Sequence, residues 1–423
     1  MRVPWRHTRL LHIYPKRFLP AYFFLNCNYC KHFTLGSLRA AARWVPAVQN
    51  VIRSCALREE SFYVYSHSEI KSTFKRWTQL FPTVTPYYAV KCNHEGTLLT
   101  SLAHLGARFD CASPSEIERV LALNVPASNI IYANPCKRVR DLLYAQACGV
   151  GLTTLDTYYE IDKIADACTE GGMAVLLRIF ASDPNAQCVL SNKFGANEPD
   201  WRRMLVHMKE RGLNCAGVSF HVGSGACTPS AFSSAIASAA AAFELARETG
   251  HSPNILDIGG GFSLSTMDNI APVVNEAIET HFGDQPDVQI IAEPGRLFAE
   301  HSAAFAVQII GMRESVTTEK RQYWITDGLY GSFNCVLFDH AVIHPPIVLK
   351  KDGTLADDSG GALETADVFG ATCDGLDTVS RDIKIPRAEV GDWLLFPDMG
   401  AYTIAGATTF NGILFNQVRT FDA

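Results

Sequence analysis

The chain has 423 residues, of which 48% are hydrophobic, so it is long and apolar enough for two folded domains. This composition excludes a disordered or fibrous protein. The formal charge of −6 is uneven, because residues 1–58 hold ten Lys and Arg and no acidic residue, leaving 27 basic against 43 acidic residues elsewhere. Since that remainder is acidic, we expect no nucleic-acid partner.

Residues 1–58 form a basic N-terminal extension without a clear period, and we predict that it is poorly ordered. Three interpretations are open: a flexible extension, an organelle-targeting peptide, or a wrongly assigned start. Abundant arginine without acids suits targeting, whereas sparse serine argues against it. The apolar run FLPAYFFL is too short to cross a bilayer, and we expect no membrane association.

The 13 cysteines are scattered and form no paired frame for zinc. We therefore expect reduced thiols and no metal site. A cytoplasmic location follows, with organelle targeting through the extension as the alternative.

From residue 86 onward, short β-branched runs alternate with segments of helical period, several of which end on glycine. Eight such alternations predict a (β/α)₈ barrel over residues 67–302. The strand-like runs are PYYAVK, ARFDCAS, IIYANP, VGLTTLD, AVLLRIFA, CAGVSFHVGSG, ILDIGGGF and VQIIAEPGR. A doubly wound open sheet competes, but DIGGGF lies in the seventh unit and lacks the G-x-G-x-x-G spacing of a dinucleotide site.

After Arg296 the period changes to two, in runs such as AFAVQIIGMRE, SFNCVLFDHAVI and DWLLFPDMGAYT. This alternation predicts an antiparallel β domain. The run SFYVYS precedes the barrel, and we expect it to join the same sheet. The predicted β domain therefore comprises residues 59–66 and 303–423.

Each strand-like run of the predicted barrel closes on a polar residue, and the carboxyl ends of barrel strands meet at one rim. Any one of these residues is explained equally well as a hydrogen-bonded rim residue, but eight together predict a site. They are Lys91, Asp110, Asn134, Asp156, Arg178, His221, Asp257 and Glu293.

The residue types in the last strand–helix units predict a site for a ligand that has a phosphate group and a ring. Gly259, Gly260 and Gly261 allow backbone N–H groups to approach a phosphate closely, and Arg296 can add a bidentate contact. Glu293 can face a ring nitrogen, and Lys91 can form a Schiff base with a carbonyl. These are the requirements of pyridoxal 5′-phosphate, on whose ring His221 could stack.

The motifs YYAVKCN, RFDCAS, IIYANPCK, VSFHVGSG, LDIGGGF, AEPGR, DGLYGSFN and TCDGLDTV occur in the order of a known family. The chain resembles the fold-type III, pyridoxal-phosphate-dependent decarboxylases, and among them the eukaryotic ornithine decarboxylases. The resemblance runs from about residue 61 to 412. It implies an alanine racemase-like fold and decarboxylation of L-ornithine to putrescine, the first step of polyamine biosynthesis.

The resemblance also assigns roles by position. Lys91 matches the Schiff-base lysine, Glu293 the partner of the ring nitrogen, and His221 the stacked histidine. Asp339, with Phe338 before it, matches the site of the substrate's distal amine. The remaining residues of the implied cofactor surroundings are Asp110, Glu116, Arg178, Ser224, Asp257, Gly259, Gly260, Gly261, Pro294, Gly295, Arg296 and Tyr402.

Cys373 and Asp374 match a pair that enters the site from a partner subunit, so the resemblance implies a homodimer with shared sites. Cys373 would protonate the substrate carbon and Asp374 would bind substrate. Antizyme is a further partner that the resemblance suggests. The segment after Arg178 and the phenylalanine at position 338 depart from the family pattern, and we expect no C-terminal degradation tail.

Several alternatives stay open. A non-catalytic, antizyme-binding paralogue is opposed by the presence of Lys91, Glu293 and Cys373 together. Lysine differs from ornithine by one methylene, so a lysine or dual lysine and ornithine decarboxylase is the nearest enzymatic alternative. Arginine is a further candidate. Diaminopimelate and alanine racemisation fit less well, because Asp339 and Asp374 suit a distal ammonium.

Overall fold

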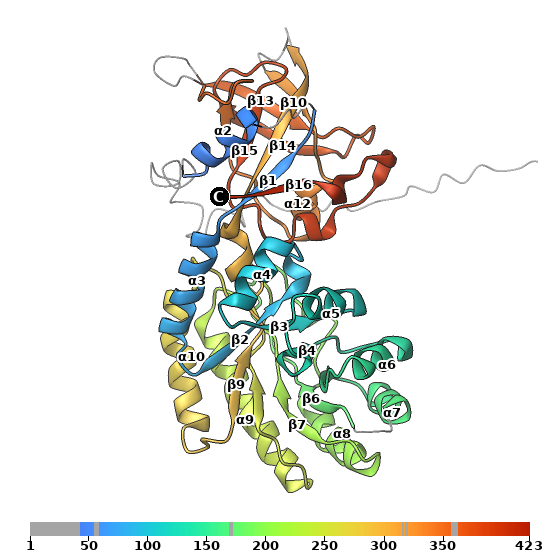
Figure 1. The fold of residues 1–423 in the computed structure, drawn as a ribbon. Helices are drawn as coiled ribbons and strands as arrows, with labels where there is room; N and C mark the ends of the chain where they lie inside the picture. The colour runs from blue at the N-terminus through green and yellow to red at the C-terminus, as the bar shows by residue number, and fades with distance from the viewer. Residues whose placement is uncertain (1–42, 55–58, 169–171, 315–316, 318–319, 357–362) are drawn as a thin grey trace, which may run out of the picture. The chain divides into compact units, whose positions relative to one another are not determined.

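The computed structural model describes residues 43–54, 59–168, 172–314, 317, 320–356 and 363–423. Its central element is a closed barrel of eight parallel strands, visible in Figure 1 with helices around it. The predicted (β/α)₈ barrel is confirmed. The strands are β2 (Val84–Ala89), β3 (Arg108–Cys111), β4 (Ile130–Tyr132), β5 (Leu152–Leu155), β6 (Ala174–Arg178), β7 (Cys215–Ser219), β8 (Ile255–Asp257) and β9 (Gln289–Ala292).

Helices connect the strands and cover the barrel with their apolar faces. Local capping fixes where several of them begin, because the side chains of Ser113 and Thr157 accept hydrogen bonds from backbone N–H groups three residues later. The helices are α3 (His67–Leu80), α4 (Gly96–His104), α5 (Pro114–Leu121), α6 (Val139–Ala147), α7 (Tyr158–Ala167), α8 (Glu198–Glu210), α9 (Pro229–Glu248), α10 (Met267–Phe282) and α11 (Arg296–Ala299).

The second sheet has the order β12-β15-β10-β11-β13-β14, and β1 pairs with both β10 and β16. Most pairs are antiparallel, as predicted, but β1 with β16 and β11 with β13 are parallel, so the sheet is mixed. Its strands are β1 (Phe62–Tyr65), β10 (Ala303–Glu314), β11 (Arg321–Ile325), β12 (Ile347–Leu349), β13 (Glu364–Phe369), β14 (Thr378–Ile385), β15 (Trp393–Phe396) and β16 (Arg419–Asp422).

The run SFNCVLFDHAVI does not form the strand that its alternation predicts. Residues Ser332–Asn334 form a 3₁₀ turn and Cys335–Phe338 a short helix, α12. The preceding turn wraps around buried Asp327, whose carboxylate accepts hydrogen bonds from the N–H groups of Gly328 and Ser332. The prediction is wrong because this buried carboxylate, which the local period does not reveal, determines the backbone.

The predicted disorder of residues 1–58 is wrong for the part that the structure describes. Val45–Ser54 forms helix α2, with Val45, Val48 and Val51 buried. Together with Trp44 they pack against Trp393 and other apolar residues of the sheet. Residues 1–42 and 55–58 lie outside the described residues.

Hydrogen bonds join the barrel to the sheet domain at the residues that follow β2 in the chain. The amide of buried Asn93 donates to the Tyr65 hydroxyl at 2.9 Å and to the Gly400 carbonyl oxygen at 2.7 Å. The backbone N–H of Tyr402 donates to the Cys92 carbonyl oxygen at 2.9 Å. The segment around Tyr402 is therefore fixed next to the barrel rim.

Candidate active site

Lys91 lies at the mouth of the barrel, in a 3₁₀ turn of Val90–Cys92 that follows β2. Its Nζ is 2.5 Å from Oδ2 of Asp110, which lies on the neighbouring strand opposite Ala89. The lysine side chain is 40% exposed, whereas that of Asp110 is fully buried. Loss of water around the amine lowers its pKa, but the charges of Asp110 and Glu293 outweigh this and raise the pKa of Lys91.

Three neighbouring carboxylates come from β3, β8 and the end of β9, and the charges of two of them, Asp110 and Glu293, act on this amine. Asp110, Asp257 and Glu293 are 0%, 1% and 7% exposed. Burial, followed by the charges of Asp257 and Asp110, raises the pKa of Glu293 well above its usual range. Burial likewise raises the pKa of Asp257, to about 7, although its carboxylate accepts a hydrogen bond from the Gly259 N–H at 2.9 Å.

Two oxygens of this cluster have no hydrogen-bond partner among the described residues: Oε1 of Glu293 and Oδ1 of Asp110. Buried carboxylate oxygens without partners are costly, so they indicate a place where a ligand donates. Glu293 lies together with Arg178 and Asp257 around a narrow space inside the barrel that is too small for a water molecule. A cationic N–H group of a ligand would be stabilised next to the unpartnered oxygens.

The glycines after β8 leave no room for side chains. A Cβ on Gly259, whose φ is +64°, would overlap the Phe220 carbonyl oxygen. One on Gly260 would lie 2.8 Å from Nε2 of His221, and one on Gly261 2.6 Å from the Gly223 carbonyl oxygen. Close packing against the segment after β7 therefore requires glycine at these positions. Gly259 and Gly260 are buried, whereas Gly261 is partly exposed. A backbone without side chains of this kind can form an anion site.

His221 follows β7 and faces this turn. Its Nδ1 accepts a hydrogen bond from the Gly223 N–H at 3.0 Å. Burial, and then the charges of Arg178 and Lys91, lower the pKa of His221 well below its ordinary value of 6.5. The imidazole is therefore neutral at physiological pH.

Arg296 begins α11 and is 7% exposed. Its Nη2 donates to Oδ1 of Asp339 at 2.5 Å and to Oγ of Ser224 at 3.3 Å. The guanidinium carbon is 5.3 Å from the centroid of the Tyr402 ring. Gly295, before it, allows the backbone to approach Cys92, since a Cβ there would lie 3.0 Å from that of Cys92.

Asp339 ends α12 and is 5% exposed, whereas the preceding Phe338 is 72% exposed. Burial raises the pKa of Asp339, and the hydrogen bond from Arg296 opposes the rise. The two residues predicted to line the substrate site thus differ: Asp339 lies beside Arg296, and Phe338 points to the surface.

Cys373 and Asp374 lie in a separate place, on the loop between β13 and β14. Cys373 is exposed, and its backbone N–H donates to the Asn411 side-chain oxygen at 3.0 Å. The carboxylate of Asp374 accepts a hydrogen bond from the Tyr330 hydroxyl. Neither side chain has a described contact with the cluster around Lys91 in the same chain.

Among the other predicted residues, the guanidinium carbon of Arg178 lies 4.9 Å from the centroid of the Phe194 ring. The carboxylate of Glu116 accepts a hydrogen bond from the Ala112 N–H at 2.6 Å. Two further residues at strand ends form hydrogen bonds to backbone groups of the barrel rim. Asn134 donates to the Ala112 carbonyl oxygen at 3.3 Å, and Asp156 accepts from the Gly195 N–H at 2.8 Å. The Pro294 carbonyl oxygen accepts a hydrogen bond from the Ala89 N–H at 3.4 Å.

The sequence-based reasoning missed two residues that contact Asp339. The side-chain amide of Gln187 donates to the backbone carbonyl oxygen of Asp339 at 2.5 Å, and Sγ of Cys188 lies 3.7 Å from Oδ1 of Asp339. Both belong to the segment after Arg178 that departs from the family pattern. That departure marks the segment as unusual but does not indicate which residues it contacts.

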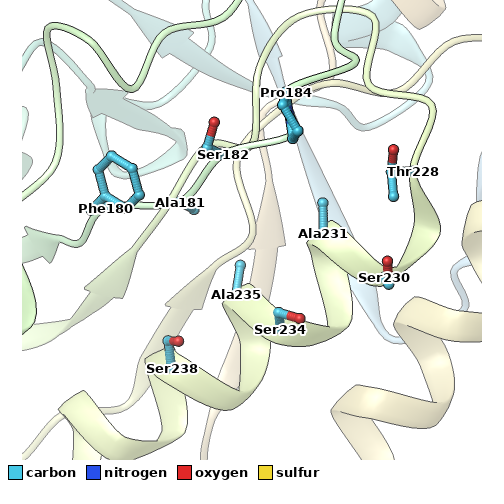
Figure 2. Close-up of a pocket in the computed structure, with 10 residues that line it drawn as sticks. All are labelled: Phe180, Ala181, Ser182, Pro184, Thr228, Ser230, Ala231, Ser234, Ala235 and Ser238. Atoms are coloured by element: carbon cyan, nitrogen blue, oxygen red, sulfur yellow. The ribbon is translucent and has the colours of Figure 1, made fainter.

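A second pocket lies outside this cluster, between residues 180–184 and the first half of α9, as Figure 2 shows. Its lining is apolar or hydroxylic and includes no charged side chain: Phe180, Ala181, Ser182, Pro184, Thr228, Ser230, Ala231, Ser234, Ala235 and Ser238. The pocket therefore offers hydroxyl groups but no ionisable side chain that could act on them as a general acid or base.

The part of the chain that the structure describes contains no group of three or more His, Cys, Asp or Glu side chains arranged to hold a metal ion. No helix in these residues is both long and apolar enough to cross a membrane.

A lysine amine beside buried carboxylates at the mouth of a barrel suits a cofactor that carries an aldehyde and a protonated ring nitrogen. Residues 67–300 match the family model for the pyridoxal-dependent decarboxylase, pyridoxal binding domain. The chain belongs to the pyridoxal-dependent decarboxylases.

Three individual proteins are similar to most of this chain. The chain is 43% identical to the chloroplastic ornithine decarboxylase of Nicotiana glutinosa over 365 residues, which is 86% of this chain and 84% of that one. It is 41% identical to mouse ornithine decarboxylase over 371 residues, covering 84% and 79%. The arginine decarboxylase of Paramecium bursaria Chlorella virus has a similar structure, with a TM-score of 0.84, 38% identity and coverage of 90% and 100%.

Proposed function

We propose that this protein decarboxylates L-ornithine to putrescine and CO₂, the first step of polyamine biosynthesis. The observation that carries the substrate assignment is the buried carboxylate of Asp339, which lies next to Arg296 at the barrel mouth. A carboxylate there suits the distal ammonium of a diamino acid. The ornithine decarboxylases among its relatives, at 41% and 43% identity, support the same substrate.

The residues of the site fit pyridoxal phosphate. Lys91 would hold the aldehyde carbon through its amine, and the unpartnered Oε1 of Glu293 would accept a hydrogen bond from the ring nitrogen. Ser224, Arg296 and the N–H groups of Gly260 and Gly261 would hold the phosphate, with Tyr402 beside Arg296. The N–H of Gly259 instead donates to Asp257 and fixes the turn. Gly295 allows the backbone to pack against Cys92, next to Lys91, and the Pro294 carbonyl oxygen accepts a hydrogen bond from the Ala89 N–H.

When bound, pyridoxal phosphate supplies an electron-accepting ring for the electron pair that remains after CO₂ departs. The protein's own groups then divide the work. Glu293 would keep the ring nitrogen protonated, and the buried carboxyl groups of Asp257 and Asp110 would determine the charge around that nitrogen. His221 is neutral and lies beside Gly260, so it can stack on the ring without adding charge. Arg178 and Glu116 would complete the polar residues around the cofactor.

We also infer that the site is shared between two copies of the chain. Cys373 is exposed and contacts none of the residues around Lys91 in its own chain, yet a thiol that protonates the substrate carbon must reach them. Phe338, Leu376 and Val342 are 72%, 69% and 67% exposed, which suits a covered apolar surface in a homodimer. The partner's Cys373 would then donate the proton, and the partner's Asp374 would bind substrate.

The decisive experiment is CO₂ release from ornithine, lysine and arginine in parallel. We expect the highest kcat/KM with ornithine, and almost no release by Lys91→Ala. Preference for lysine or arginine would replace the substrate assignment. No release from any substrate would favour the non-catalytic, antizyme-binding alternative.

Mixing tests the shared site. Lys91→Ala and Cys373→Ala chains are each expected to be inactive. An equimolar mixture should recover up to about a quarter of wild-type activity, because half the dimers are mixed and each of those has one intact site out of two. No recovery in dimers that demonstrably exchange subunits would contradict sharing.

Antizyme binding and the compartment stay predictions. Co-purification with antizyme tests the first. For the second, we propose the cytoplasm, with organelle targeting by residues 1–58 as the alternative; two relatives are named chloroplastic. Fusing residues 1–58 to a fluorescent protein distinguishes these locations.

A further inference from the structure

The segment Asp183–Cys188, which we call the clamp loop, is fixed to the residues after β7. Asp183 is fully buried, and its Oδ2 accepts hydrogen bonds from the N–H groups of Cys227 and Thr228 at 2.9 and 2.8 Å. Cys188 and Ser224 exchange two backbone hydrogen bonds of 3.0 Å. The loop is therefore attached at both ends to the segment that carries His221 and Ser224.

Glycines allow this close approach. A Cβ on Gly223 would lie 2.7 Å from that of Ala186, and one on Gly225 would lie 2.9 Å from that of Gln187. The backbone N–H of Gln187 also donates to the Gly225 carbonyl oxygen at 3.4 Å. The backbone of Gln187 is thus held in place without any contribution from the end of its side-chain amide that donates hydrogen bonds.

The side chain of Gln187 extends from this fixed backbone to the sheet domain. Its Nε2 donates to the Asp339 carbonyl oxygen at 2.5 Å and lies 3.3 Å from Oδ2 of the same residue. Asp339 is at the end of a four-residue helix and is followed by His340 with a φ of +55°. Such a short helix end is weakly held by its own hydrogen bonds, so the contact from Gln187 restrains both its backbone and its carboxylate.

We propose that Gln187 is a positioning residue that fixes the Asp339 carboxylate at the depth that suits the distal ammonium of ornithine rather than that of lysine. The inference rests on the proposed function, in which Asp339 receives that ammonium. Lysine is one methylene longer, and a fixed pocket discriminates one methylene by about 10- to 200-fold. A carboxylate that could shift would lose part of this discrimination.

The chemistry of the amide suits this role. Gln187 donates to Oδ2, whereas Arg296 donates to Oδ1, so the two oxygens are held from different sides. The guanidinium of Arg296 is positively charged, and a bound phosphate would also pair with it. The amide is neutral, so it orients Asp339 without cancelling the negative charge that attracts an ammonium.

The test compares Gln187→Met with wild type in the holoenzyme. Methionine keeps the length of the side chain but cannot donate a hydrogen bond. We expect KM for ornithine to rise roughly 3- to 10-fold with kcat within about twofold, as befits one lost hydrogen bond. The ratio of kcat/KM for ornithine to that for lysine should fall by roughly threefold or more. Calorimetric binding of putrescine should weaken in parallel.

Asn185→Ala is the matched control. It lies on the same loop, but its amide donates to the Thr228 hydroxyl at 3.2 Å on the exposed side. We expect wild-type kinetics from it. A Gln187→Met enzyme with wild-type KM and substrate ratio would overturn the inference, as would an equal loss of kcat with both substrates, which indicates general distortion. If wild-type protein released no CO₂ from ornithine, the proposed function itself would fail, which is a distinct result.

Discussion

Replacing Glu293 by glutamine should stabilise the cofactor-free protein while weakening the enzyme. Glu293, Asp110 and Asp257 form a buried cluster in which burial and neighbouring charges oppose ionisation. Glutamine has nearly the same shape but no charge. The substitution therefore separates the contribution of this group to folding from its contribution to function.

The magnitude follows from the neighbouring carboxylate. Burial, reinforced by the charge of Asp110 and opposed by the hydrogen bond from Gly259, raises the pKa of Asp257 from 3.8 to about 7. One pKa unit corresponds to about 1.4 kcal/mol, so the cluster opposes ionisation of one carboxylate by about 4 kcal/mol. Glu293 is not a cause of that rise, since its hydrogen bond lowers the pKa of Asp257. Glutamine instead removes the cost of ionising Glu293 itself, and we expect about 1–3 kcal/mol of added stability at pH 8.

The sign of the pH dependence follows from the direction of the shift. The folded-state pKa of Glu293 lies above its ordinary value of 4.5. Wild-type protein therefore loses stability as pH rises from that value through the raised folded-state pKa. The advantage of Glu293→Gln should grow over the same window and be larger at pH 8 than at pH 5.

Thermal unfolding of the cofactor-free proteins, followed by circular dichroism at both pH values, measures this advantage. Glu118→Gln is the control, because Glu118 is exposed on α5 and should change neither curve. With pyridoxal phosphate, Glu293→Gln should lower kcat by about 10²-fold or more. A variant that unfolds below wild type at pH 8, or whose advantage is independent of pH, would refute the reasoning.

Two further substitutions test other parts of the molecule. Gly259→Ala would place a Cβ against the Phe220 carbonyl oxygen at a φ of +64°, so we expect a loss of about 2–4 kcal/mol and weaker cofactor binding in a spectroscopic titration. Wild-type affinity would contradict the phosphate assignment. Trp44→Ala removes a side chain that is 2% exposed and should lower the free energy of unfolding by about 3–5 kcal/mol. An unchanged unfolding temperature would argue against the packing of α2.

The barrel and one side of the site were predictable because their signals are local. Strand and helix periods alternate along the chain, and the rule that barrel strands present their carboxyl ends at one rim locates Lys91, Asp110 and Glu293 together. The pairing of Lys91 with Asp110 needs only two adjacent strands. The conformational freedom of glycine at 259 and 261 is likewise visible from residue type.

The remaining features depend on contacts between distant parts of the chain. Nothing near Gln187 indicates that its amide meets Asp339, which lies 152 residues further on. The position of Asp339 itself depends on a turn built around buried Asp327, so alternation misled the prediction there. Helix α2 did have a local signal, the spacing of Val45, Val48 and Val51, but it lay within a segment interpreted by its charge.

The placement of β1 constrains the order in which the protein can fold during synthesis. This strand leaves the ribosome before the barrel, yet its partners β10 and β16 lie at residues 303–314 and 419–422. The barrel strands can therefore close while β1, with its four buried residues, still lacks both neighbours. An apolar strand that waits this long is exposed to non-native pairing, so chaperone dependence should be concentrated in the sheet domain rather than in the barrel.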